Sequence, residues 1–142
     1  MSFQHILCAV DLTHEADAKA MLTEAGKLAD THDAKLSVIT AIPDYGSSWV
    51  ASFFRDGTLK EAVQAADAAL HGLVKDTLPE RQVQHITELG VAYEKVLEAV
   101  DTTGADLVLV GAHKPDLADR VLGPNAARIV RHAMVSVMVM RF

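Results

Sequence analysis

The chain has 142 residues, of which 50% are hydrophobic and 23% charged, and its formal net charge is −6. This composition predicts one soluble globular domain over residues 1–142 and excludes a disordered chain. The acidic balance argues against a nucleic-acid-binding protein, whose surface normally carries a basic stripe. No apolar run reaches the roughly 18 residues that a membrane span needs, and no signal peptide is visible, so we expect no membrane association and a cytoplasmic location.

Hydrophobic periodicity predicts that strands and helices alternate along the chain. In chain order we expect strand Phe3–Val10, a helix from Thr13 or His14 to about Thr31, strand Lys35–Ile42, a long aromatic-rich connection over 43–57, helix Thr58–Thr77, strand Gln82–Leu89, a helix from Gly90 to near Thr103, strand Leu107–Val110, a helix opened by Gly123-Pro124-Asn125, and strand Val135–Met140. This alternation implies an α/β fold, a doubly wound parallel five-stranded sheet with helices on both faces.

In such a sheet, ligands bind at the carboxyl ends of the strands, where the strand order reverses. Asp11 directly follows the first strand and Gly111 ends the central one, so we expect these two residues to lie close together. The helix that Pro124 opens faces the same edge, and free N–H groups at a helix start can bind phosphate.

The remaining patterns argue against other kinds of site. Cys8 is the single cysteine and lies in an apolar strand, which favours an inert buried thiol. The seven histidines show no metal-ligand spacing, so no metal site is expected. The final strand is continuously apolar, which predicts that it pairs with a second subunit rather than leaving an open edge.

Several segments together resemble the universal stress protein family. They are Ala9-Val10-Asp11, Ile42-Pro43, Glu88-Leu89-Gly90, the run from Ala105 to His113, and the run from Leu122 to Ala133. The resemblance covers essentially the whole chain, and its C-terminal part is most similar to the branch typified by universal stress protein F. It implies a cytoplasmic homodimer, paired through the last strand, whose sheet has the order 3-2-1-4-5.

Many members of this family bind ATP through a Gly-x2-Gly-x9-Gly-[Ser/Thr] motif, with an aspartate after the first strand on the ribose. Here Gly111 matches the first glycine, Lys114 replaces the second, Gly123 comes one residue early, and Pro124 replaces the hydroxyl residue. Pro124 offers a phosphate neither an N–H nor a hydroxyl group, although Lys114 adds a positive charge.

The resemblance therefore implies an adenine-nucleotide site for ATP, ADP or AMP, with or without magnesium. Its residues are Ala9, Val10, Asp11, Thr40, Ala41, Ile42, Gly111, Ala112, His113, Lys114, Gly123, Pro124, Asn125 and Ala126. In this site Asp11 accepts the ribose hydroxyls, the backbone from Thr40 to Ile42 reads the adenine edge, and the start of the last helix receives phosphates.

Each of these residues also has a purely structural interpretation. Asp11 can cap the following helix, Gly111 can permit a tight turn, and Gly123 can simply begin a helix. His113 and Lys114 can be solvated loop residues.

Three functions remain open. The first is a regulatory nucleotide-binding module that acts through an unknown protein partner. The second is a universal stress protein that has lost nucleotide binding and acts only as a dimeric interaction protein. The third is an enzyme with weak ATP hydrolysis or autophosphorylation, although the sequence shows no P-loop, metal-binding carboxylate pair or activated nucleophile.

Overall fold

A computed structural model describes residues 2–43, 56–112 and 124–142. Strands and helices alternate through these ranges as β1 (His5–Ala9), α1 (Glu15–His32), β2 (Lys35–Ile42), α3 (Asp56–Thr77), β3 (Gln84–Leu89), α4 (Ala92–Thr103), β4 (Leu107–Ala112), α5 (Pro124–His132) and β5 (Ser136–Arg141). The predicted alternation is confirmed. Residues 44–55 of the predicted aromatic-rich connection lie outside the described residues.

The five strands form one parallel sheet in the order β3-β2-β1-β4-β5, as the family resemblance implied. β1 is central, and it pairs with β2 on one side and with β4 on the other. The strand order therefore reverses between β1 and β4, which places a topological switch point at their carboxyl ends. β3 and β5 lie at the two edges of the sheet.

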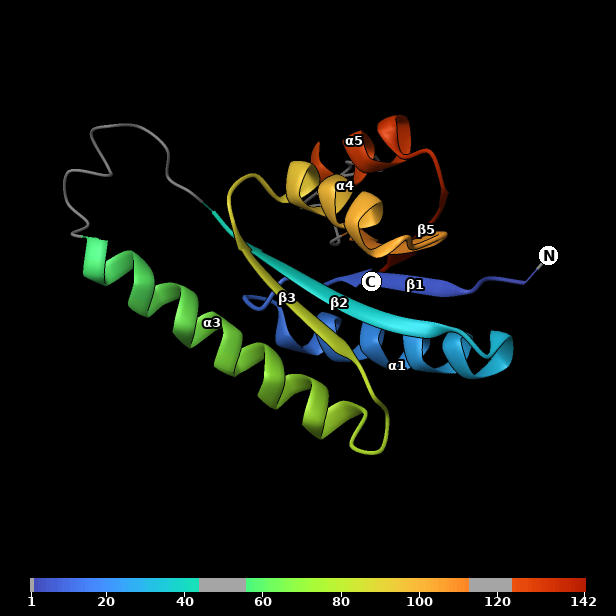
Figure 1. Ribbon diagram of the computed structural model, residues 1–142, viewed down its shortest axis with the longest axis horizontal. Coiled ribbons are helices and arrows are strands. Elements are labelled where there is room, and N and C mark those ends of the chain that lie inside the picture. Colours follow the sequence, from blue (N-terminus) through green and yellow to red (C-terminus); the bar gives the residue numbers. More distant parts are fainter. Residues whose placement is uncertain (1, 44–55, 113–123) are drawn as a thin grey trace.

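Helices cover both faces of the sheet (Figure 1). α1 and α3 pack on one face over a core that includes Ile6, Leu22 and Leu70, and α4 and α5 pack on the other over a core that includes Leu7 and Val108. Consecutive residues of β1 thus belong to different cores, because successive side chains of a strand point to opposite faces. This two-sided burial explains the uninterrupted apolar runs of the central strands.

Several predicted boundaries differ from the structure by one or two residues, and two of these differences have a local reason. α4 begins at Ala92 rather than Gly90, because Gly90 has a φ of 146° and donates its N–H to the carbonyl of Ile42 at 2.8 Å. β3 begins at Gln84 rather than Gln82, because a turn closed by the Arg81 N–H and the Leu78 carbonyl precedes it. The predicted end of this helix near Thr103 is confirmed, because Gly104, with a φ of 75°, follows Thr103 and terminates α4.

The single cysteine is buried in the core, as predicted. Cys8 has 0% exposure, and desolvation by burial raises the pKa of its thiol to about 12. At neutral pH this thiol is protonated, so it lacks the thiolate that nucleophilic or metal-binding chemistry requires.

Candidate functional site at the carboxyl ends of the strands

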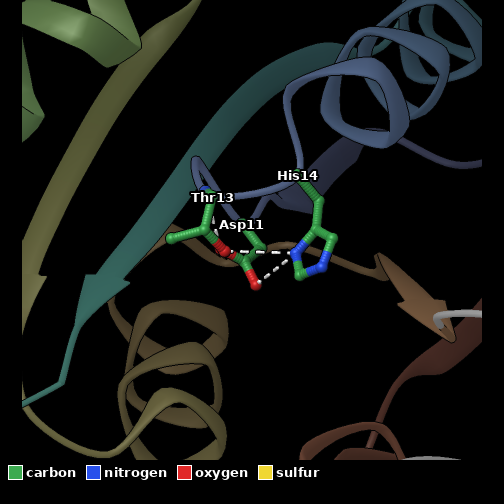
Figure 2. Close-up of polar contacts among 3 residues, drawn as sticks. All are labelled: Asp11, Thr13 and His14. Atoms are coloured by element: carbon green, nitrogen blue, oxygen red, sulfur yellow. Dashed lines mark hydrogen bonds and ion pairs between the residues drawn. The ribbon is translucent and has the colours of Figure 1, made fainter.

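Asp11 lies on the rim of the sheet just beyond β1, and its carboxylate is held by Thr13 and His14, the two residues that precede α1 (Figure 2). Its Oδ1 accepts hydrogen bonds from the Thr13 N–H at 2.9 Å and the Thr13 hydroxyl at 2.6 Å. Its Oδ2 lies 3.2 Å from Nδ1 of His14. The bond from the Thr13 N–H makes a local Asx turn. Asp11 therefore does not cap α1 in the usual way.

These contacts also set the ionisation of Asp11. Desolvation acts to raise the pKa of its carboxyl, but the two Thr13 hydrogen bonds and the His14 ring outweigh desolvation, so the pKa lies below its usual value. The carboxylate is thus ionised at neutral pH, and 47% of its side-chain surface remains exposed. An ionised and accessible carboxylate is suited to accept hydrogen bonds from hydroxyl groups of a ligand.

β2 extends beyond β1 at this edge and presents backbone groups there. The β1–β2 pairing in the described residues ends with Ala9 opposite Ile39 and the hydrogen bond from the Val10 N–H to the Ile39 carbonyl. The backbone N–H and C=O groups of successive residues in a strand point alternately to one neighbouring strand and to the other. The backbone groups of Ala41 therefore point toward the β1 side, as those of Ile39 do. The backbone groups of the next residue, Ile42, point toward β3, and the Ile42 carbonyl accepts the Gly90 N–H there.

Gly111 is part of β4, opposite Met140 of β5, rather than in a tight turn. A Cβ atom on Gly111 would lie 3.0 Å from Sδ of Met21 and 3.2 Å from Cε2 of Phe142. A larger residue at this position would therefore require the Met21 or Phe142 side chain to shift by a few tenths of an ångström. Ala112 ends β4 and is buried.

The start of α5 faces the start of α4. Pro124 is the first residue of α5, as predicted, and Ala126 is buried against the sheet. The side-chain Oδ1 of Asn125 accepts the Tyr93 N–H at 3.2 Å, so this side chain satisfies a backbone donor of α4. The Arg128 guanidinium lies 4.8 Å above the Tyr93 ring, in a cation–π contact that joins the same two helices.

The structure thus gathers Ala9, Val10, Asp11, Thr40, Ala41, Ile42, Gly111, Ala112, Pro124, Asn125 and Ala126 on the carboxyl side of the sheet, where each was expected. His113, Lys114 and Gly123 lie outside the described residues. The sequence predicted only a helix start at Thr13 or His14, and it did not reveal the contacts of these residues with Asp11. The Asp-x-Thr spacing of an Asx turn was the available signal for Thr13, whereas no local signal links Tyr93 to Asn125.

A hollow of about 860 Å³ lies at the opposite, amino-terminal edge of the sheet. Some of its polar lining residues are bonded to one another: Arg81 forms an ion pair with Asp30, and the Ser37 hydroxyl lies 2.7 Å from Nε2 of His5 and donates to Oε1 of Gln84 at 2.8 Å. Two buried atoms of lining residues, Thr77 Oγ1 and Arg81 Nε, have no hydrogen-bond partner among the described residues. The switch point is at the other end of the strands.

Within residues 2–43, 56–112 and 124–142, no group of three or more His, Cys, Asp or Glu side chains is arranged to hold a metal ion. None of the described helices is both long and apolar enough to cross a membrane.

Two curated relatives are similar in sequence. Universal stress protein G of Shigella flexneri is 36% identical over 63 residues, which is 44% of this chain and 44% of that protein. Universal stress protein A homolog 1 of Coxiella burnetii is 28% identical over 143 residues, covering 97% of this chain and 96% of that one. The first match therefore spans less than half the length of the relative. These relatives carry the names G and A homolog, not F.

Solved structures share the fold. Hypothetical protein MJ0577 superposes with a TM-score of 0.79 at 15% identity, over 100% of this chain and 98% of its own. A universal stress protein solved in complex with cAMP superposes with a TM-score of 0.63 at 19% identity, over 99% of this chain and 98% of its own. The model of the universal stress protein family matches residues 2–141. The chain therefore belongs to the universal stress protein family.

Proposed function

We propose that this protein is a regulatory module that binds ATP or another adenine nucleotide at the carboxyl ends of β1, β2 and β4. The observation that carries the proposal is Asp11, an ionised and half-exposed carboxylate held at the switch point of the sheet. Ligands of parallel α/β sheets bind at this point. The fold neighbour in complex with cAMP supports an adenine nucleotide as the ligand class.

The parts of the nucleotide are assigned to residues by position. Asp11 accepts the ribose hydroxyls, and the backbone N–H and C=O of Ala41 read the adenine edge beyond the end of β1. The N–H groups at the start of α5 receive phosphates, since Asn125 uses its side chain for Tyr93 and leaves its main chain to this role. Gly123 and Lys114 complete the phosphate region in this proposal, as the family motif implies.

The direct test is calorimetric titration of nucleotide-free protein with ATP, ADP and AMP, with and without magnesium. We expect micromolar binding of at least one nucleotide. Asp11→Ala should weaken it about tenfold to a hundredfold, because hydrogen bonds to a charged group are worth about 1.5–3 kcal/mol. Asp101→Ala is the matched control, since Asp101 is an exposed carboxylate on α4, away from the switch point. Unchanged affinity in Asp11→Ala contradicts the ribose contact.

A second candidate function is a dimeric interaction protein that binds no nucleotide. Pro124 at the first position of α5 favours it, because this residue supplies no N–H where the family motif has a hydroxyl residue. Absence of binding heat, together with no thermal shift at millimolar nucleotide, supports this candidate over the first.

We propose further that the protein works in the cytoplasm as a homodimer paired through β5. This strand pairs with β4 on one side, lies at the edge of the sheet, and carries four half-buried apolar residues, Val137, Met138, Val139 and Met140. Light scattering should give twice the mass of one chain. The likeness to the F branch also remains a proposal, because it rests on the loop that precedes α5.

A further inference from the structure

We infer that the stacked rings of His71 and His85 make the packing of α3 against β3 sensitive to mild acid, so that residues 59–71 of α3 open more readily when both rings carry a proton. His71 lies on α3 and His85 lies on β3. Neither residue belongs to the proposed nucleotide site, so this acid-sensitive contact is independent of nucleotide binding.

The two rings form a direct contact between a helix and an edge strand. Their centroids are 3.8 Å apart and their planes differ by 13°, so the rings are stacked. α3 packs against β3 on one face of the sheet (Figure 1), and β2 is the only strand that pairs with β3 among the described strands. Two neutral imidazole rings can stack at this distance, whereas two protonated rings place like charges close together and repel each other.

One carboxylate lies beside the stacked pair. Oδ2 of Asp67 is 3.5 Å from Nε2 of His71, four residues further along α3, and Oδ1 of Asp67 accepts the Thr87 hydroxyl of β3 at 2.8 Å. Asp67 therefore compensates a positive charge on His71 and also connects α3 to β3.

His85 forms no ion pair of its own in the part of the chain that the structure describes. The charged and titratable groups that act on His85 there are His71 and Asp67, both on α3, and the residue opposite it on β2 is the buried, apolar Val38. Burial, followed by the charge of His71, lowers the pKa of His85, and the opposing effect of Asp67 is smaller. His85 is therefore neutral at neutral pH.

This lowered pKa gives the direction of the pH effect. A histidine in an unfolded segment has a pKa of about 6.5, so His85 binds a proton more readily after α3 and β3 separate than while they are packed. Above about pH 6.5 the ring is mainly neutral in both forms, and the contact has its full strength. As the pH falls below that value and through the lower pKa of the packed ring, proton binding favours the separated form.

The stacked pair lies where the packing of α3 changes. Among the described residues from Leu59 to Asp67 none is fully buried, whereas Leu70, Leu73 and Val74 belong to the core. A segment with few buried apolar contacts opens locally at a low cost in free energy. A helical segment of this length is not stable in water without packing, so its amides should exchange with solvent once the contact with β3 is lost.

The test measures amide hydrogen exchange of residues 59–71 at pH 7.5 and 5.5, as protection factors corrected for the intrinsic effect of pH. In the natural protein we expect protection to fall about fivefold in acid, the effect of two like unit charges about 4 Å apart in water. His85→Phe keeps a ring that can stack but removes the titrating group, so its protection should change by less than about twofold. Gln64→Ala, an exposed position on the same helix, is the control and should keep the natural fall.

Three outcomes overturn the inference. The first is equal protection of these amides at both pH values in the natural protein, and the second is the natural fall in His85→Phe. The third is a matching fall for the amides of Leu7 and Cys8 in β1, because it would mean that acid opens the whole domain.

Titration of the histidine rings by NMR gives a check that needs no substitution. A His85 ring that titrates above pH 6.5 in the natural protein contradicts the inference. In His71→Phe the pKa of His85 should rise, because the charge of His71 is one of the causes that lower it. A pKa that stays the same in this variant would show that the two rings do not interact electrically.

Discussion

Two aspartates lie at opposite ends of the central strands, and they differ in where their partners lie along the chain. Asp106, just before β4, accepts the Gln4 N–H at 3.0 and 3.1 Å and the His5 N–H at 3.0 Å, from more than 100 residues away. Asp11, just after β1, is held only by residues two and three positions later among its described partners. The Asp106 carboxylate connects the starts of β1 and β4. The Asp11 carboxylate contacts nearby residues among its described partners and lies on the rim of the sheet, where a ligand can bind.

Similar ionisation accompanies these different roles. Desolvation acts to raise the pKa of Asp106, but the His5 and Gln4 N–H groups outweigh it, so the pKa lies below the usual value, as it does for Asp11. A lowered pKa alone therefore does not identify a functional carboxylate. The distance along the chain to its partners is the better guide here, because a contact between distant segments stabilises the fold.

The largest expected effect breaks the bonds of Asp106. Asp106→Ala should lower the free energy of unfolding by about 1–3 kcal/mol, because it leaves backbone donors without their partner. Chemical denaturation measures this change, with Asp101→Ala as the control for loss of an exposed carboxylate. Nucleotide affinity should stay the same. If Asp11→Ala destabilises the fold as much as Asp106→Ala, the contrast between the two residues is wrong.

A smaller effect is expected for Ser37, in the polar cluster at the amino-terminal edge. Ser37 has 0% exposure and contacts both His5 and Gln84. Ser37→Ala should cost about 1 kcal/mol of unfolding free energy, the net value of a typical hydrogen bond. The measurement is again chemical denaturation. A loss of nucleotide affinity without a loss of stability would place function at this edge instead.

The pH dependence of stability should distinguish the effect of the Asp106 charge from the effect of the size of its side chain. A carboxyl whose pKa is lower in the folded state stabilises the fold above its unfolded pKa of about 3.9, and this stabilisation disappears as the pH falls through the folded value. Asp106→Asn removes this titrating group. The stability of the variant should therefore fall less steeply than that of the natural protein as the pH is lowered from about 5. This range is chosen because ordinary carboxyl groups have pKa values of about 4. Thermal unfolding over this pH range measures the slope. An unchanged slope contradicts the assigned shift.

The smallest effect concerns Thr13. Thr13→Val removes the hydroxyl donor to Asp11 but keeps the N–H donor, so stability should change by only about 0.5 kcal/mol. The pKa of Asp11 should rise, because one of the bonds that lowers it is lost. Titration of the Asp11 carboxyl by NMR measures this shift, and a fall in its pKa would refute the assigned role of the hydroxyl.

Much of the fold was predictable because burial imposes periodicity on the sequence. β1, β2 and β4 are buried on both faces, so they read as apolar runs, and the helices show their apolar stripe at helical spacing. The start of α4 was misplaced because the left-handed φ of Gly90 serves a contact with β2, which neighbouring residues do not reveal.

The candidate site was predictable to a lesser extent. Asp11 was identified by its place after a buried strand, which is local information. The packing of Gly111 against Met21 and Phe142 and the bond between Asn125 and Tyr93 join segments far apart in sequence, so one amino-acid sequence carries no visible trace of them. Only the three-dimensional structure reveals such contacts.

The central position of β1 has a consequence for how the chain folds during synthesis. β1, α1 and β2 emerge from the ribosome before β4, so β1 and β2 can pair early, but the other side of β1 remains unpaired until β4 is made, more than 90 residues later. Until then an apolar strand presents an open edge of the kind that promotes association between chains. Asp106, which binds the start of β1, belongs to the segment that closes this edge, so the yield of folded protein from a cell should depend on it more than on any residue of the proposed nucleotide site.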